Sequence, residues 1–336
     1  MRIIVDVMGS DLGCAELVKG ALDAKAQLGD ELELTLVGKE SEIRGAITAN
    51  KADASTVTIV DAATVMDMND APTDVIKAKK DSSMAVALTL LRNGEGDGLV
   101  SCGNTGALLT GATMIVKRIK GVRRAALAPS APNLQGRFLI IDSGANVECK
   151  PEYLLQFGLM GTIYASKVLK VNNPRVGLLN NGAEETKGTD LHIESHQLLK
   201  TSGLNFVGNI EGPAAFSAEC DVLVSDGFSG NIFLKACEGM SLLVNNLIKD
   251  VFVGSFSGNI AALLVMKGIK NMRNKTISKE VGGAPLLVVC KHVIKGHGNS
   301  DAYALKNAIK LACEYAKSGV IDDIQESVAN YTDDKE

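Results

Sequence analysis

The stretch Phe138-Leu-Ile-Ile-Asp142, followed at once by Ser143-Gly-Ala-Asn146, decides the fold class of this chain. Its apolar residues run without the alternation of a half-exposed strand, which is typical of a parallel strand covered on both faces. The polar, glycine-containing turn behind it leads toward a segment of helical period. The pair predicts one strand–helix unit of an α/β fold.

Similar short apolar runs, separated by segments of helical period, occur on both sides of this stretch. The other predicted strands are Arg2–Val7, Leu32–Val37, Val57–Asp61, Gly98–Ser101, Arg175–Leu179, Asp221–Ser225, Pro285–Cys290 and His292–Lys295. The predicted helices are Ala15–Leu28, Ser41–Asn50, Ser83–Asn93, Gly106–Ile119, Glu152–Leu169, Asp190–Ser202 and Asp301–Lys317. Such alternation predicts a three-layer α/β/α fold with a mostly parallel sheet, in which any two lobes share that sheet.

Two segments depart from this rhythm. The segment Met240–Lys279 is helical in period and broken by Gly254-Ser-Phe-Ser-Gly258, which predicts a helical hairpin. The acidic tail, residues 321–336, is expected to fray, so residues 1–320 are expected to form a single domain.

Composition excludes several classes of protein. The 336 residues are 46% hydrophobic and 22% charged, as in a soluble globular protein. A net charge of −4 and an aromatic content of 4% give no general basis for binding nucleic acid. The seven cysteines are dispersed, which predicts a cytoplasmic protein with neither disulfides nor a zinc site. No metal or cofactor is expected, and no apolar run approaches the ~20 residues that span a bilayer.

Ligands of parallel sheets bind beyond the carboxyl ends of the strands, and four turns there are polar and rich in glycine. These are Cys102-Gly-Asn-Thr-Gly106, Ser143-Gly-Ala-Asn146, Asp226-Gly-Phe-Ser-Gly-Asn231 and Gly296-His-Gly-Asn-Ser-Asp301. Any one of them is equally well explained as a helix cap. Together they favour an anion site, and phosphate is the expected anion.

Two charged or titratable side chains accompany these turns. Lys187 follows the strand Arg175–Leu179, either as a functional cation or as a solvated loop residue. His297 lies between two glycines, which favours an exposed functional imidazole, with Asp301 as its orienter or as a helix cap. His192 and His196 are four residues apart, but no third ligand accompanies them, so a solvated helix face is expected rather than a zinc site.

A series of motifs resembles the phosphate acyltransferases of the PlsX family. The motifs are Asp6-Val-Met-Gly-Ser-Asp11, Lys79-Lys-Asp-Ser-Ser-Met84, Val100-Ser-Cys-Gly-Asn-Thr-Gly-Ala-Leu108, Arg118-Ile-Lys-Gly121, Asn172-Asn-Pro-Arg-Val-Gly-Leu-Leu-Asn180, Asp226-Gly-Phe-Ser-Gly-Asn231, Gly282-Gly-Ala-Pro-Leu-Leu287 and His297-Gly-Asn-Ser-Asp301, together with the segment that runs from Gly144 to Phe157. They occur in order from residue 3 to about residue 315. One departure is Leu12, because the family usually has a histidine there.

The resemblance implies an enzyme that converts acyl-(acyl carrier protein) and inorganic phosphate into acyl phosphate and free carrier protein. It implies a fold like that of isocitrate and isopropylmalate dehydrogenases, a homodimer, and a product used by the glycerol-3-phosphate acyltransferase of bacterial phospholipid synthesis. Phosphate is then the nucleophile, and no protein nucleophile is needed.

Site roles are assigned on that reaction. Lys187 is expected to supply the counter-charge to phosphate, Asn231 to bind phosphate or the oxyanion, and His297 to protonate the leaving thiolate. Further contacts to the substrates are expected from Asn104, Thr105, Asn146, Ser300 and Asp301.

The hairpin carries one-sided charge beside apolar residues. From residue 249 to residue 279 the only acid is Asp250, and the basic residues include Lys267, Lys270 and Arg273. With Leu263 and Leu264 they predict peripheral contact with an anionic membrane. A hairpin buried in the dimer interface and a docking site for the acidic carrier protein are the alternatives.

Other functions fit less well. A membrane-surface scaffold that binds phospholipid precursors without catalysis is the non-enzyme alternative. A metal- and NAD-dependent dehydrogenase requires a converging set of acids, which the sequence does not display. A phosphotransacetylase that uses coenzyme A is closer in chemistry, but the motifs above are not those of that family.

Overall fold

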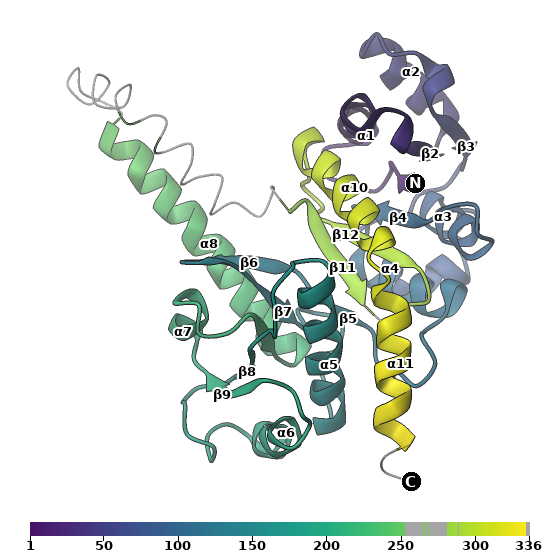
Figure 1. Cartoon of the computed structure of the whole chain (residues 1–336). Helices are drawn as coiled ribbons and strands as arrows, with labels where there is room; N and C mark the ends of the chain where they lie inside the picture. Colours follow the sequence, from purple (N-terminus) through teal and green to yellow (C-terminus); the bar gives the residue numbers. More distant parts are fainter. Residues whose placement is uncertain (253–264, 266–267, 269–280, 288, 334–336) are drawn as a thin grey trace.

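The computed structural model describes residues 1–252, 265, 268, 281–287 and 289–333, which form two sheets rather than one (Figure 1). The larger sheet has seven strands in the order β3-β2-β1-β4-β12-β11-β5. Its strands are β1 (Arg2–Asp6), β2 (Glu33–Gly38), β3 (Thr58–Asp61), β4 (Gly98–Ser101), β5 (Ala126–Leu127), β11 (Gly283–Leu287) and β12 (His292–Gly296). Its first five strands pair in parallel, whereas β11 pairs antiparallel with both of its neighbours, β12 and the edge strand β5.

The smaller sheet has five strands in the order β6-β7-β10-β8-β9. They are β6 (Ser130–Asn133), β7 (Gly136–Ile141), β8 (Val176–Leu179), β9 (Phe206–Ile210) and β10 (Val222–Val224). Only the edge strand β6, which contains Pro132, is antiparallel. The apolar run that precedes Asp142 lies in β7, where Phe138 and Ile141 are completely buried.

Helices cover both faces of each sheet. They are α1 (Cys14–Leu28), α2 (Glu40–Ala49), α3 (Ser83–Arg92), α4 (Thr105–Gly111), α5 (Pro151–Lys167), α6 (Asp190–Lys200), α7 (Gly212–Phe216), α8 (Gly227–Phe252), α10 (Ala302–Lys317) and α11 (Val320–Asp333), with the short turns η1 (Gly29–Glu31), η2 (Ala54–Thr56), η3 (Pro72–Ile76) and η4 (Ala112–Val116). On the larger sheet α1, α2 and α10 pack on one face and α3 on the other, while α5 and α6 lie opposite α7 and α8 on the smaller one. The predicted three-layer, mostly parallel α/β fold is confirmed.

Two predictions about organisation are wrong. The lobes do not share one sheet, although the larger of two hydrophobic clusters runs through both, from Ile3 of β1 to Val222 of β10. The acidic tail does not fray as far as Asp333, because Val320, Ile324 and Val328 form a buried stripe on α11 that joins this core.

The first arm of the predicted hairpin belongs to α8, which begins at Gly227 and is therefore longer than expected. The predicted membrane or carrier contacts Leu263, Leu264, Lys267, Lys270 and Arg273 lie outside the described residues. Among the helices of the described ranges, none is long and apolar enough to cross a membrane.

Candidate active site

The carboxyl ends of neighbouring strands bring the predicted turns together in two groups. In the smaller sheet β7, β10 and β8 are adjacent and parallel. The segments that follow them, 142–146, 226–231 and 180–189, therefore lie together at the carboxyl ends of these strands. In the larger sheet β4 and β12 are adjacent, so the turns 102–106 and 296–301 lie together. Each predicted site residue within the described chain falls in one of these segments.

Asp142 is the centre of the first group. Its buried carboxylate accepts hydrogen bonds from the amides of Leu127, Ala145 and Asn146 at 2.9, 3.0 and 2.7 Å. Burial raises the pKa of Asp142, and these hydrogen bonds offset only part of that rise. The carboxyl group therefore organises the loop after β7 from within.

The start of α8 packs directly on this loop. A Cβ atom at Gly227 would lie 2.5 Å from the carbonyl oxygen of Asn146, so only glycine permits the approach. Asp226 caps the helix by accepting hydrogen bonds from the amides of Phe228 and Ser229, both at 2.9 Å. The helix start and the loop after β7 thus form one rigid corner.

Asn146 and Asn231 both lie in this corner, but they differ in the hydrogen bonds that their side chains make. The side-chain amide of Asn146 donates to the carbonyl of Ala125 at 2.5 Å and to Asp142 at 3.0 Å, which uses both of its N–H groups. Asn231 lies over Gly144, where a Cβ atom would be 3.5 Å from the Asn231 amide carbon, and its side chain is half-buried. Within the described part of the chain, that amide makes no hydrogen bond, so it is available to a ligand.

Lys187 is exposed in the loop after β8, yet its main chain is held on both sides. Its amide donates to the carbonyl of Glu184 at 3.1 Å, and its carbonyl accepts from Asn180 Nδ2 at 3.1 Å. Burial lowers the pKa of His192 at the end of this loop, and the nearby charge of Asp226 partly opposes that shift.

In the larger sheet Asn104 has a structural role. Its Oδ1 accepts the amide of Ala107 at 3.0 Å and caps α4, while its Nδ2 donates to the carbonyls of Asp67 and Met68, both at 3.1 Å. The neighbouring Thr105 is half-buried. The predicted contribution of the Asn104 side chain to phosphate binding is therefore not supported by its contacts, and Thr105 remains the candidate in this turn.

His297 is exposed and lies against α8, where its Nε2 is 3.0 Å from Glu238 Oε1. Glu238 follows Asn231 by seven residues on α8, which puts both side chains on one helix face, roughly 10 Å apart along the axis. The helix thus connects the group at the smaller sheet with the turn after β12. Sequence reasoning did not single out Glu238, because this contact spans 59 positions.

Asp301 and Ser300 lie at the end of the last turn and differ in their contacts. Asp301 caps α10 by accepting the amide of Ala304 at 2.9 Å, as its alternative interpretation predicted. Ser300 is buried, with its Oγ lacking a hydrogen-bond partner in the described structure. Beside it, burial lowers the pKa of Lys295, whose Nζ donates to the carbonyls of Gly296 and Cys102.

Lys295 and Asp6 were missed by sequence reasoning. Burial raises the pKa of Asp6, and hydrogen bonds from Ser83 and Ser101 partly counter that rise. Both ionisable groups are at least nine-tenths buried at the carboxyl ends of β12 and β1. The available signal was a charged residue ending an otherwise apolar strand.

Leu12, which replaces the usual histidine, is 51% exposed. The expectation of a solvated face around His192 and His196 is wrong: His196 is only 3% exposed, and His192 is half-buried, with its Nδ1 2.9 Å from the hydroxyl of Thr189. His196 is therefore a core side chain, and His192 is partly exposed.

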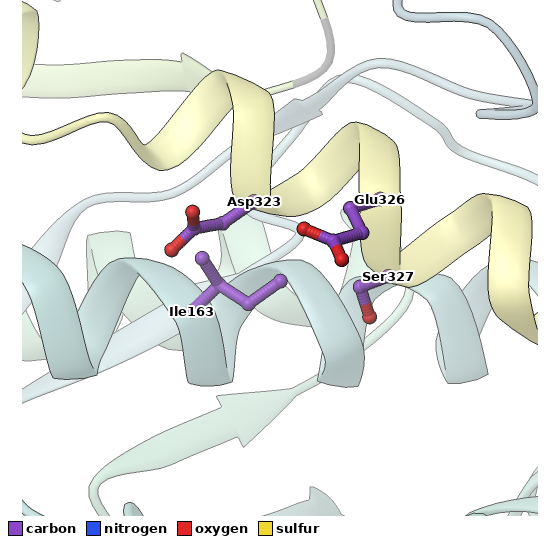
Figure 2. Close-up of a pocket in the computed structure, with 4 residues that line it drawn as sticks. All are labelled: Ile163, Asp323, Glu326 and Ser327. Carbon is purple, nitrogen blue, oxygen red and sulfur yellow. The ribbon is translucent and has the colours of Figure 1, made fainter.

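A separate groove of about 360 Å³ lies between α5 and α11. Figure 2 shows Ile163 of α5 facing Asp323 and Glu326 of α11, with Ser327 beside them. None of these four residues is a predicted site residue.

Comparisons with known proteins agree on the family. The family model described as "Fatty acid synthesis protein" matches residues 1–323. A phosphate acyltransferase of Clostridium tetani is 42% identical over 330 residues, which is 98% of each chain. Another, of Clostridioides difficile, is 40% identical over 335 residues, covering 99% of this chain and 98% of the relative.

Among solved structures, a phosphotransacetylase from Streptococcus pyogenes aligns with a TM-score of 0.61 at 18% identity and covers 94% of both chains. The EutD phosphotransacetylase from Staphylococcus aureus aligns with a TM-score of 0.60 at 15% identity and the same coverage. At such identities the likeness is one of fold. The predicted family and enzyme class are confirmed by the full-length relatives: the chain is a transferase enzyme and belongs to the phosphate acyltransferases, a family of fatty acid synthesis proteins.

Proposed function

We propose that this enzyme transfers an acyl group from acyl-(acyl carrier protein) to inorganic phosphate, giving acyl phosphate and free carrier protein. One observation carries the proposal: Lys187 and Asn231 end up at adjacent strand ends with side chains not committed to the fold, in a chain of the phosphate acyltransferase family. A cation and an amide donor beyond the ends of neighbouring strands suit a phosphate that must approach a carbonyl carbon.

In this reaction an oxygen of hydrogen phosphate attacks the thioester carbonyl, and the C–S bond then breaks. The lone pair leaves with sulfur, and the proton lost by phosphate is balanced by the one gained by the thiolate. Lys187 holds the dianion, and Asn231 Nδ2 donates to the oxyanion that develops on the carbonyl. Asn146 has no free N–H, so we assign it to holding the loop rather than to the oxyanion.

His297 is the proposed proton donor to the departing thiolate. It is exposed, and its Nε2 lies 3.0 Å from Glu238 Oε1, a contact that orients the ring. Thr105 is the proposed remaining contact from the larger sheet.

The context of the reaction is part of the proposal. The product would be consumed by a glycerol-3-phosphate acyltransferase, the enzyme would act as a homodimer, and the basic hairpin with Leu263 and Leu264 would touch an anionic membrane from the cytoplasm. The exposed apolar side chains of Leu243, Leu247 and Val251 lie on the first arm of that hairpin, which belongs to α8, and they support an apolar contact there.

An assay of phosphate-dependent thioester loss from acyl-(acyl carrier protein), with no metal or NAD added, tests the proposal. We expect acyl phosphate and free carrier in equal amounts. Lys187→Ala and Asn231→Ala should each lower kcat/KM about a hundredfold, as for the loss of a charge-stabilising donor. Asn245→Ala is the matched control on α8 and should stay near the wild-type rate. It removes a side-chain amide that donates to the carbonyl of Ser241 and lies two helical turns beyond Glu238.

Activity with acyl coenzyme A alone would instead favour the phosphotransacetylase reaction. Phosphate binding without thioester loss would favour the non-catalytic scaffold.

A further inference from the structure

His196 and Asn209 form a buried polar pair behind the loop that carries Lys187. His196 is 3% exposed and Asn209 is 6% exposed, and His196 Nδ1 lies 3.0 Å from Asn209 Oδ1. The ring of His196 also packs edge-on against Phe206 at 5.0 Å between centroids. Buried polar groups of this kind are costly unless they are fully bonded, so their orientation is fixed by their partners.

One member of this pair, Asn209, is bonded to the carbonyl of Glu184 in the loop of Lys187. Asn209 Nδ2 donates to the carbonyl of Glu184 at 2.7 Å. Because the amide nitrogen is used there, Asn209 presents its oxygen to His196, and Nδ1 of the imidazole carries the proton. The chain of contacts thus runs from α6 through β9 into the loop after β8.

The same carbonyl of Glu184 also accepts the amide of Lys187, at 3.1 Å. One oxygen atom therefore connects the buried pair to the peptide of the cation. Glu185 adds a weaker, exposed attachment through its ion pair with Lys200 at 2.7 Å.

We propose that Asn209, oriented by His196, is a positioning residue that fixes Lys187 against its phosphate. This inference rests on the proposed role of Lys187. It explains why a long exposed loop can hold a cation in place: the peptide of Lys187 is bonded to a carbonyl that is itself held from the core. A displacement of about 1 Å at a reacting group can cost roughly a hundredfold in rate.

Asn209→Ala tests the proposal against a matched control. Asn205 lies just before β9, and its Nδ2 donates to the carbonyl of Asn173 at 3.0 Å. Asn205→Ala therefore removes the same type of bond at the other end of the same strand. We expect Asn209→Ala to lower kcat/KM for phosphate about tenfold, with little change in the KM for the acyl thioester. Asn205→Ala should retain the wild-type value.

A double variant separates positioning from general damage. In a Lys187→Ala background, Asn209→Ala should have no further effect on the rate, because the group it positions is gone. An equal loss in both backgrounds would overturn the proposal, as would full activity of Asn209→Ala. If Asn209→Ala does not fold, His196→Phe applies the same tests, since it keeps a ring against Phe206 but removes the bond to Asn209.

Trypsin cleavage measures how firmly the loop of Lys187 is held, without depending on enzyme activity. It cuts after lysine, so mass spectrometry should find faster cleavage of the Lys187–Gly188 bond in Asn209→Ala than in Asn205→Ala. Equal cleavage in the two variants would overturn the anchoring. If Lys187→Ala itself proves fully active, the proposed function of Lys187 fails, while this cleavage result still decides whether Asn209 holds the loop.

Discussion

At the scale of single residues, the same side chain serves either the fold or the chemistry, according to what else it touches. Asn104, Asn146 and Asn231 all follow strand ends in polar turns. The first caps α4 and the second bonds Asp142, whereas the third has an uncommitted amide within the described structure. The hydrogen bonds that each side chain already makes therefore distinguish these three asparagines, which residue type alone does not.

His297 gives the residue-scale prediction. If His297 donates the proton to the departing thiolate, His297→Gln should lower kcat with little change in the KM for the acyl thioester, because glutamine cannot supply that proton. Measuring kcat and KM separately in the thioester assay decides the matter, and a raised KM with the wild-type kcat would show that His297 acts in binding instead.

The sequence was sufficient to place Lys187, Asn231 and His297 beyond the carboxyl ends of strands, because each follows a recognisable strand, and their roles in catalysis stay predictions. It was not sufficient for Lys295, Glu238 or Asn209. Their significance comes from partners far away along the chain, such as Cys102 for Lys295, and from burial that composition cannot indicate.

At the scale of elements, the buried parallel strands were predictable and the irregular ones were not. The predicted strand Gly98–Ser101 coincides with β4, whereas β6 and β9 were missed. β6 contains a proline and β9 contains Gly208, both of which weaken a strand pattern. The division into two sheets was missed because it depends on long-range pairing, which local periodicity does not specify.

The C-terminal helix α11 gives a prediction of stability. Ile324 is completely buried between α11 and α5, beside the ion pair of Lys167 and Asp323 at 2.7 Å. Ile324→Ala should lower the free energy of unfolding by about 3 kcal/mol, through lost burial and a residual cavity. Urea denaturation measures it, with the exposed neighbour Gln325→Ala as the control. A loss below that of the control would mean that α11 does not contribute to the core.

An ion pair at the amino ends of β8 and β10 predicts a dependence on pH. Asp221 accepts from Arg175 Nε at 3.0 Å and from its Nη2 at 2.9 Å. Burial tends to raise the pKa of Asp221, but the hydrogen bonds from Arg175 outweigh it, so the pKa is lowered. A lowered pKa stabilises the fold above the unfolded value near 4, and this stabilisation is lost as pH falls through the folded pKa.

Asp221→Asn should therefore destabilise the protein by about 1 kcal/mol at pH 7, a modest value because Arg175 is partly solvated. The difference from the wild type should shrink below about pH 4. Urea midpoints at several pH values measure this, with Asp23→Asn on the exposed side of α1 as the control. A difference that stays constant with pH would assign the effect to packing rather than charge.

At the scale of the whole molecule, the two sheets are joined by helix packing rather than by a shared sheet. Tyr164 of α5 and Tyr315 of α10 meet edge-to-face at 5.6 Å between ring centroids, and both are fully buried. One element comes from each half of the structure, so these rings fill the joint between the halves. The Lys187 and Asn231 group lies in one half and the turn of His297 in the other, so the proposed site depends on this joint.

We therefore expect the described residues of both sheets to unfold as one cooperative unit, in line with the predicted single domain of residues 1–320. Far-UV circular dichroism reports the sheets and helices, and the near-UV tyrosine signal reports the joint. The chain has five tyrosines and no tryptophan, so the buried pair contributes much of that signal. The two signals should change at the same urea concentration.

Tyr315→Ala should move both midpoints down together, with a loss of about 3 kcal/mol or more in the free energy of unfolding from the emptied site. Tyr315→Phe should cost little, because the Tyr315 hydroxyl is buried without a hydrogen-bond partner in the described structure, and removing such a group relieves a desolvation penalty. Separate midpoints in the wild type would show that the halves are independent domains. In that case the geometry between Asn231 and His297 would be set by domain docking rather than by folding.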